Sequence, residues 1–402
     1  MKSCTLICIL TFFAPSSAGR DDAQLESLVK SLQSKDDKVR LSAMRDLAEL
    51  GPKAEPVIPQ LSKLLQDGGE DQRLSAAMVL GKIGKKSLPV LSDQAANRDD
   101  DVRYYAVWAI GLIGPDAVSA APVVVKALTD TNVGVKRKAA FALGRIEPDA
   151  SLAVPTLMHA LEDGNPEVRK AVAEALAKFG DKALPDLIKA LDRPAVRTEA
   201  MQALAIIGVP AKDAIPALRL LLLGDDQKLT TAAAQTLGKI GKDSLSAFAD
   251  GMKSDSAYVR GKSIEGLAQI GTDAVPALID ATGDKNLDVR QQAVKRLVAM
   301  RVNDKSVAIA LAYALKDDDK EIKMSALQGL NFQGTGAAPA VPQLIVALKD
   351  NDPNIRRMCA LVLGRIGPAA ADAIPALKAA TEDVSPQVRN AAQRALTLIE
   401  KK

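Results

Sequence analysis

The stretch DTNVGVKRKAAFALGRI, residues 130–146, decides the fold because its pattern recurs along the whole chain. An aspartate and a few polar residues lead to a valine followed by a basic residue, and Ala, Leu and Ile then follow at fixed positions. Counted from Val135, apolar side chains stand at offsets 0, 4, 8 and 11, namely Val135, Ala139, Leu143 and Ile146. At about 100° per residue these offsets fall within one narrow arc. The stretch therefore predicts a helix with a single buried stripe.

The same pattern returns at intervals of about 33 residues. Its first position falls at Val39, Gln72, Val102, Val135, Val168, Val196, Leu229, Val259, Val289, Ile322, Ile355 and Val388. Offset 8 is Leu or Ile in every copy, and offset 11 is apolar except at Gln333. A period of this length is typical of repeat architectures, in which each unit stacks on its neighbours. The chain is therefore expected to contain about twelve units.

A second helix is expected ahead of each of these helices. In several copies a proline opens it, and the first helical turn tolerates the missing N–H; these are Pro155, Pro185, Pro342 and Pro375. Glycines predict where the preceding helix ends: Gly84, Gly114, Gly180, Gly208, Gly241, Gly271 and Gly367. The fold class predicted is all-α, an α-solenoid of about twelve stacked antiparallel helix pairs. The step from Val168 to Val196 is shorter than the others, so a helix or a loop must be shortened there.

An aspartate stands six residues before the basic residue in many copies, as in Asp163 and Arg169. With these motifs the chain resembles the HEAT-repeat family over about residues 22–400, and in particular short bacterial repeats of the phycobilisome-lyase type. The resemblance implies a HEAT-like superhelix in which these charged pairs bond turns to neighbouring units. A row of pairs at a fixed interval is therefore expected to be structural rather than catalytic. Thr230 departs from the pattern because it replaces the basic residue.

Residues 1–18 have the pattern of a secretory signal peptide. Lys2 precedes an apolar stretch, and small residues lie just before Gly19. The stretch is too short to span a bilayer, although an uncleaved membrane anchor is the alternative. Residues 19–402 are expected to form one repeat solenoid, exported to the periplasm or the medium, with no stable membrane span after signal cleavage.

Composition argues against several classes of function. The 53 basic and 49 acidic residues nearly balance at a net charge of +4, so we expect no nucleic-acid partner. His159 is the only histidine, and Cys359 is the only cysteine after the signal peptide. A zinc site or a catalytic triad needs more such partners. We therefore expect no catalytic, metal or cofactor site, and we expect Cys359, at offset 4, to be a buried thiol.

Offsets 2 and 6 lie opposite the buried stripe and are polar in most copies. In the first four copies several become apolar or aromatic, which predicts an exposed protein-binding surface. The alternative is that these side chains pack against one another or the next unit. The candidate residues are Leu41, Leu74, Met78, Tyr104, Tyr105, Trp108 and Phe141, with Arg137 and Lys170 at the border, where they would attract an acidic partner.

The sequence therefore favours an exported, non-enzymatic scaffold that binds a protein or peptide partner. The family resemblance implies an alternative, a lyase- or oxidoreductase-type HEAT-like enzyme or its accessory subunit. Phycobilisome-lyase-type proteins assist bilin attachment, and other relatives oxidise substrates at a metal. The export signal and the scarcity of histidine and cysteine weigh against this alternative.

Overall fold

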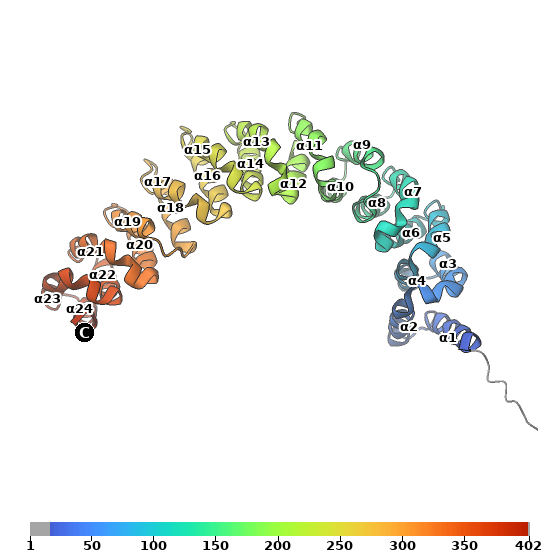
Figure 1. The fold of residues 1–402 in the computed structure, drawn as a ribbon, viewed down its shortest axis with the longest axis horizontal. Coiled ribbons are helices and arrows are strands. Elements are labelled where there is room, and N and C mark those ends of the chain that lie inside the picture. Colours follow the sequence, from blue (N-terminus) through green and yellow to red (C-terminus); the bar gives the residue numbers. More distant parts are fainter. Residues whose placement is uncertain (1–16, 401–402) are drawn as a thin grey trace, which may run out of the picture. The chain divides into compact units, whose positions relative to one another are not determined.

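The computed structural model describes residues 17–400, apart from the side chains of residues 17–22, Asp37 and Leu41. Within this range all regular structure is helical and no strand occurs. The predicted signal peptide lies outside the described residues, except that α1 (Ser17–Ser31) begins within its last two positions. The helices fall into two compact units, divided between Asp186 and Leu187, and each unit is described by itself (Figure 1).

The first unit contains α1 and then α2 (Asp37–Leu50), α3 (Ile58–Asp67), α4 (Glu70–Ile83), α5 (Leu88–Gln94), α6 (Asp100–Ile113), α7 (Ala121–Ala127), α8 (Val133–Ile146), α9 (Ala150–Ala160) and α10 (Pro166–Lys178). The division falls within α11 (Leu184–Ala190). The second unit continues with α12 (Arg197–Ile207), α13 (Ile215–Leu222), α14 (Gln227–Ile240), α15 (Leu245–Met252), α16 (Ala257–Ile270), α17 (Val275–Ala281), α18 (Leu287–Ala299), α19 (Lys305–Ala314), α20 (Lys320–Gln333), α21 (Val341–Ala347), α22 (Pro353–Ile366), α23 (Ile374–Ala380) and α24 (Pro386–Glu400).

Within each unit the helices form two layers. Every even-numbered helix carries one copy of the sequence pattern, and consecutive even-numbered helices of the same unit pack on each other, as α4 does on α6 and α6 on α8. The odd-numbered helices form the other layer (Figure 1). Short 3-10 segments such as η3 (Gly114–Ala120) join many of the helices. This arrangement confirms the predicted all-α solenoid of antiparallel helix pairs.

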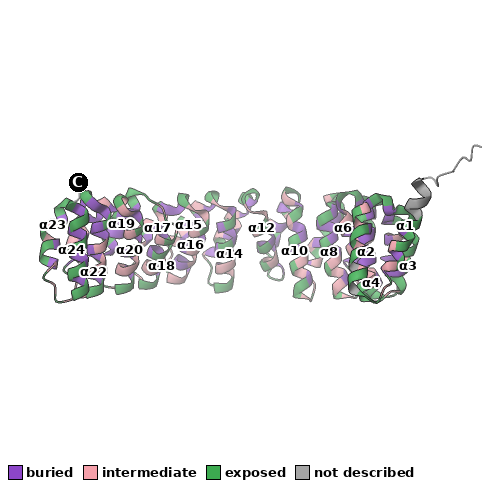
Figure 2. Ribbon diagram, turned by 90° about the horizontal axis from the view of Figure 1, so that it is seen from below, coloured by how far each residue is buried: buried purple, intermediate pink, exposed green. Residues whose placement is uncertain are grey.

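The buried stripe of the even-numbered helices forms the core. All twelve offset-4 residues, from Ala43 to Ala392, and all offset-8 residues, from Leu47 to Leu396, are buried. In Figure 2 buried and exposed segments alternate along these helices, as the helical period requires. At offset 0 of the first copy, however, the Val39 side chain is 40% exposed. The stripe therefore specifies how each unit stacks on its neighbours.

The ends of the helices follow local chemistry. Asn132 caps α8, since its side-chain oxygen accepts from the Gly134 backbone N–H at 2.7 Å. The seven predicted stop glycines all have positive φ, and Glu147 takes the equivalent place after α8 with φ 50°. The prediction for Pro155 is wrong in detail. Asp149 caps α9 early through the Ser151 N–H, so this proline lies inside the helix instead of in its first turn.

The charged pairs form a ladder between consecutive repeats, as expected. The guanidinium of Arg103 donates to both carboxylate oxygens of Asp130 in the next repeat, at 2.7 and 2.9 Å. It also donates to the Asn97 carbonyl of its own turn at 3.0 Å. Other rungs of this ladder join Lys136 to Asp163, Arg260 to Asp284, Arg290 to Asp317, Lys323 to Asp350 and Arg356 to Asp383. Because both side chains are mostly buried, these pairs stabilise the repeat interface rather than form a reactive site.

The two departures from the pattern have local consequences. The short step before Val196 includes a short connection, since the 3-10 segment η4 (Gly180–Lys182) has three residues whereas η3 has seven, and α12 begins only after Val196. At Thr230 the hydroxyl replaces a guanidinium and donates to the Gly224 carbonyl at 3.2 Å. Thr230 therefore keeps the hydrogen bond to the turn of its own repeat, but it cannot form the ion pair to the next repeat.

Candidate functional site

The candidate residues of the first unit lie on α2, α4, α6, α8 and α10. Those whose side chains are described occupy the side of the helix away from the buried stripe, except Tyr105. Leu74 is 37% exposed and Phe141 is 40% exposed. Met78, Tyr104 and Trp108 are half-buried. We call the surface made by Leu74, Met78, Tyr104, Trp108 and Phe141 the aromatic face. The Leu41 side chain lies outside the described residues.

For Tyr105 the expectation of an exposed side chain is wrong. It is only 8% exposed and lies beneath the aromatic face. Its ring centroid is 5.0 Å from that of Tyr104, with the planes perpendicular, and 6.4 Å from that of Trp108. Burial raises the pKa of its phenol above the ordinary value. Tyr105 therefore packs beneath Tyr104 and Trp108 and is not part of the exposed surface.

Close approach between α6 and α8 holds the rings of the aromatic face in place. A methyl group on Gly134 would lie 3.1 Å from Cδ2 of Tyr104, and one on Gly111 would lie 3.2 Å from Cδ1 of Phe141. The rings of Tyr104 and Phe141 thus each cover a glycine of the opposite helix. The rings are fixed by the packing of two repeats, which limits the conformational entropy that binding would cost.

Lys138 is a site residue that the offset-2 and offset-6 analysis missed. Its ammonium nitrogen lies 5.0 Å from the ring centroid of Trp108, 5.1 Å from that of Tyr104 and 5.9 Å from that of Phe141. These distances are those of cation–π contacts. The residue stands at offset 3, and only its spacing of three from Phe141 on one helix hinted that it reaches the rings.

The two predicted basic residues at the border differ in their surroundings. Arg137 is exposed, and its Nη2 lies 3.7 Å from Oε2 of Glu167 on α10. Lys170 is exposed on α10, one turn before the exposed Glu174. The border therefore carries both signs of charge, and Lys138 is the cation at the centre of the aromatic face.

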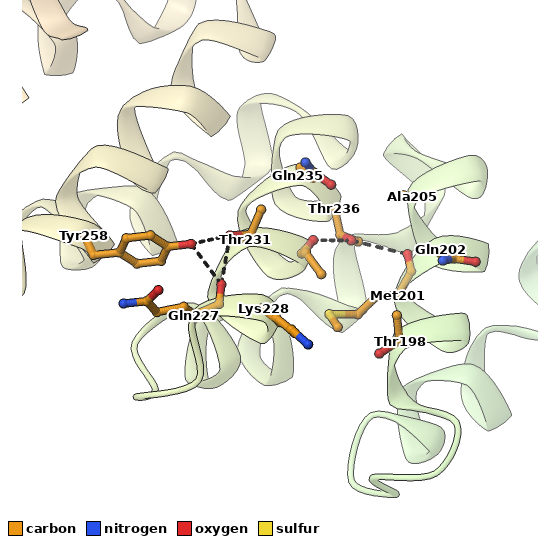
Figure 3. Close-up of a pocket in the computed structure, with 11 residues that line it drawn as sticks. Thr198, Met201, Gln202, Ala205, Gln227, Lys228, Thr231, Gln235, Thr236 and Tyr258 are labelled. Atoms are coloured by element: carbon orange, nitrogen blue, oxygen red, sulfur yellow. Dashed lines mark hydrogen bonds between the residues drawn. The ribbon is translucent and has the colours of Figure 1, made fainter.

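The second unit has a groove at the equivalent repeat positions, of a different character. It spans about 490 Å³ and is lined by side chains of α12, α14 and α16. Figure 3 shows Gln202, Gln235 and Thr198 around it, with Met201 and Thr236 on its floor. The Tyr258 hydroxyl closes one end, where it lies 2.7 Å from Oγ1 of Thr231 and donates to the Gln227 carbonyl at 3.1 Å. Amide and hydroxyl groups replace the aromatic rings here.

Cys359 and His159 are the residues that were considered for catalysis or metal binding. Cys359 is fully buried at offset 4, and burial raises the pKa of its thiol far above the ordinary value. This confirms the predicted buried thiol. His159 is exposed on α9, at the edge of a hollow near the Lys136–Asp163 pair. Across residues 17–400 no cluster of three or more His, Cys, Asp or Glu side chains has a metal-binding arrangement.

Two segments, Asp100–Ala127 and Pro353–Ala380, are long and apolar enough to cross a membrane by length and composition. Each consists of two helices joined by a 3-10 segment, η3 in the first and η9 (Gly367–Ala373) in the second. About half of each apolar window is buried inside the protein, 50% and 44% respectively. In the structure these segments are core helices of the repeats.

Comparison with known families identifies the repeat. A model of HEAT repeats matches residues 25–111, 88–154, 121–205, 154–238, 184–260, 245–331 and 310–397. These matches cover most of the chain, so the protein belongs to the HEAT-repeat family. Among curated proteins no sequence matches the chain.

Several solved structures share the fold. Kap121p bound to Nup53p aligns with a TM-score of 0.62 and 14% identity, over 96% of this chain and 50% of that one. The karyopherin Kap121p bound to the extreme C-terminus of the protein phosphatase Cdc14p gives 0.59 and 13%, over 96% and 50%. Yeast importin-β, Kap95p, gives 0.50 and 15%, over 97% and 62%. The chain spans only about half to three fifths of these proteins, and at such identities the likeness shows the fold alone.

Proposed function

We propose that the protein is a non-enzymatic scaffold that binds a protein or peptide partner through the aromatic face of its first unit. The observation that carries the proposal is the position of Trp108, which is half-buried on the side of the helices away from the core and shares the Lys138 ammonium with Tyr104 and Phe141. Large aromatic side chains held in a partly exposed, rigid setting are typical of binding hot spots. The core of the same helices is already filled by Ala139, Leu143 and their equivalents.

The fold gives this proposal general support. Kap121p, which shares the solenoid, has been seen bound to Nup53p and to Pho4p, so a solenoid of this kind can present a surface to protein partners. Architecture alone does not fix function, and the aromatic face is therefore the stronger argument. The nearly balanced charge of the chain supports a protein partner over a nucleic acid.

The proposal includes export and the short-repeat, phycobilisome-lyase-like subtype of the family. Lys2, the apolar stretch after it and the small residues before Gly19 support cleavage of a signal peptide. The periplasm or the medium is then the compartment of the mature protein, which carries no stable membrane span. Mass spectrometry of protein from its native source should find an N-terminus near Gly19. A soluble pool that retains Met1 would contradict this part of the proposal.

The binding role is tested by replacing Trp108 in the full chain. Trp108→Ala should weaken partner capture by about 2 kcal/mol, roughly thirtyfold, because a central aromatic anchor is lost. The matched control is Gln235→Ala, which changes offset 6 of a helix in the second unit and should leave capture unchanged. Circular dichroism must show that both variants keep the helical fold. Equal capture by both folded variants would remove the aromatic face as the binding site.

A further inference from the structure

The ammonium group of Lys138 has an unusual environment for a lysine on a helix surface. Three rings lie within 5.9 Å of it, two at 5.0 and 5.1 Å. Within residues 17–400 it makes no hydrogen bond or ion pair with protein groups, although it carries three donors. The aromatic face therefore has a positive charge at its centre with no carboxylate beside it.

Several carboxylates around this face are engaged elsewhere. Asp99 accepts from Arg73 at 2.8 Å, and Asp101 lies 3.5 Å from the same guanidinium. Asp100 accepts from the side-chain amide of Asn132 at 2.5 Å. On the α10 side, Glu167 lies close to Arg137, as described above. The charge of Lys138 is thus left for a ligand to neutralise.

We propose that the partner segment is acidic and apolar: one carboxylate binds Nζ of Lys138, and flanking apolar side chains cover Trp108, Phe141 and Met78. This rests on the proposed function and specifies the chemistry of its partner. A salt bridge formed over the rings is shielded from water, which strengthens it relative to a pair on an open surface. A long polyanion fits less well, because the exposed carboxylates of Glu70 and Glu174 lie on the neighbouring helices α4 and α10.

The test uses three acetylated heptapeptides that differ only in the central residue, Asp, Asn or Lys, flanked on both sides by Leu and Phe. Trp108 is the only tryptophan, so its emission reports binding at this face alone. The full-chain protein, Lys138→Met and Lys170→Met are titrated with each peptide. Methionine keeps an unbranched side chain over the rings, and Lys170→Met makes the same change of net charge at the border on α10.

The Asp peptide should bind the unmodified protein about tenfold more tightly than the Asn peptide, as expected for a charge-assisted hydrogen bond. This preference should vanish in Lys138→Met and persist in Lys170→Met. Equal binding of the Asp and Asn peptides, tighter binding of the Lys peptide, loss of the preference in both variants, or no binding of any peptide would overturn the inference. The binding role itself is judged separately, by the effect of Trp108→Ala on partner capture.

Discussion

The aromatic face of α4, α6 and α8 and the groove of α12, α14 and α16 occupy the same positions of the repeat, but their side chains differ completely. In the first unit offset 6 carries Trp108 and Phe141, whereas in the second it carries Gln202 and Gln235. The helices beneath share one core pattern, with offsets 4 and 8 buried in both units. The repeat thus separates two tasks, because the stripe determines stacking while the opposite side is free to vary.

The largest effect expected concerns what the two regions share. Leu143 in the first unit and Leu237 in the second stand at offset 8 and are fully buried. Replacing either by alanine should lower the free energy of unfolding by about 2–5 kcal/mol, the cost of a cavity in a packed core. Urea denaturation followed by circular dichroism measures the loss.

Hydrogen exchange sharpens this prediction. The loss of protection should centre on the helices next to the substituted leucine and fade with distance, since each repeat contacts chiefly its neighbours. A uniform loss of protection through all described helices after Leu143→Ala would contradict the nearest-neighbour description of the solenoid.

The ladder provides a second comparison between the units. Arg103→Met removes the paired hydrogen bonds to Asp130 and should cost about 1.5–3 kcal/mol, the range for hydrogen bonds to charged groups. Thr230→Val removes one neutral hydrogen bond to the Gly224 carbonyl and should cost about 0.5–1.5 kcal/mol. Urea midpoints of the two variants test the order. If Thr230→Val proved the more damaging change, the stabilising role of the cationic rungs would be disproved.

Acid should weaken the ladder rungs. The hydrogen bond from Arg356 lowers the pKa of Asp383 below its ordinary value. A carboxylate with a lowered folded-state pKa contributes stability that is fully present above the unfolded pKa, about 3.9, and is lost as pH falls through the folded pKa. Stability should therefore decline below about pH 4, which urea titrations at several pH values measure. Asp383→Asn should reduce this dependence, and an unchanged slope would show that the pair contributes no such linkage.

The smallest effects are expected on the polar side of the second unit. Gln235 is exposed at the groove and makes no hydrogen bond with a described residue, so Gln235→Ala should change the free energy of unfolding by no more than about 0.5 kcal/mol. Trp108→Ala should cost about 1–2 kcal/mol, because its ring is half-buried against Tyr105 and Lys138. Thermal denaturation compares the two. A loss of 3 kcal/mol or more at Trp108, as for a fully buried aromatic residue, would place this ring in the core and weaken the proposed face.

Sequence alone determined the architecture, because the same apolar offsets recur in twelve copies and a helix converts such a period directly into one buried side. It also located the ladder and the buried Cys359, since both stand in repeated columns. It predicted a shortened helix or loop before Val196, and the structure shows a short connection, η4, within that step.

Only the tertiary structure decided how the side chains outside the repeated columns are arranged. Tyr105 and Tyr104 are adjacent in sequence, yet one is buried and the other half-exposed, because α6 turns each toward a different neighbour. The residues at offset 3 follow no common pattern, so the sequence did not single out Lys138. Packing of α6 against α8 brings its ammonium close to three rings from two repeats. A repeat period specifies what every copy shares; contacts between the side chains of different copies depend on the distance between helices, which no single column records.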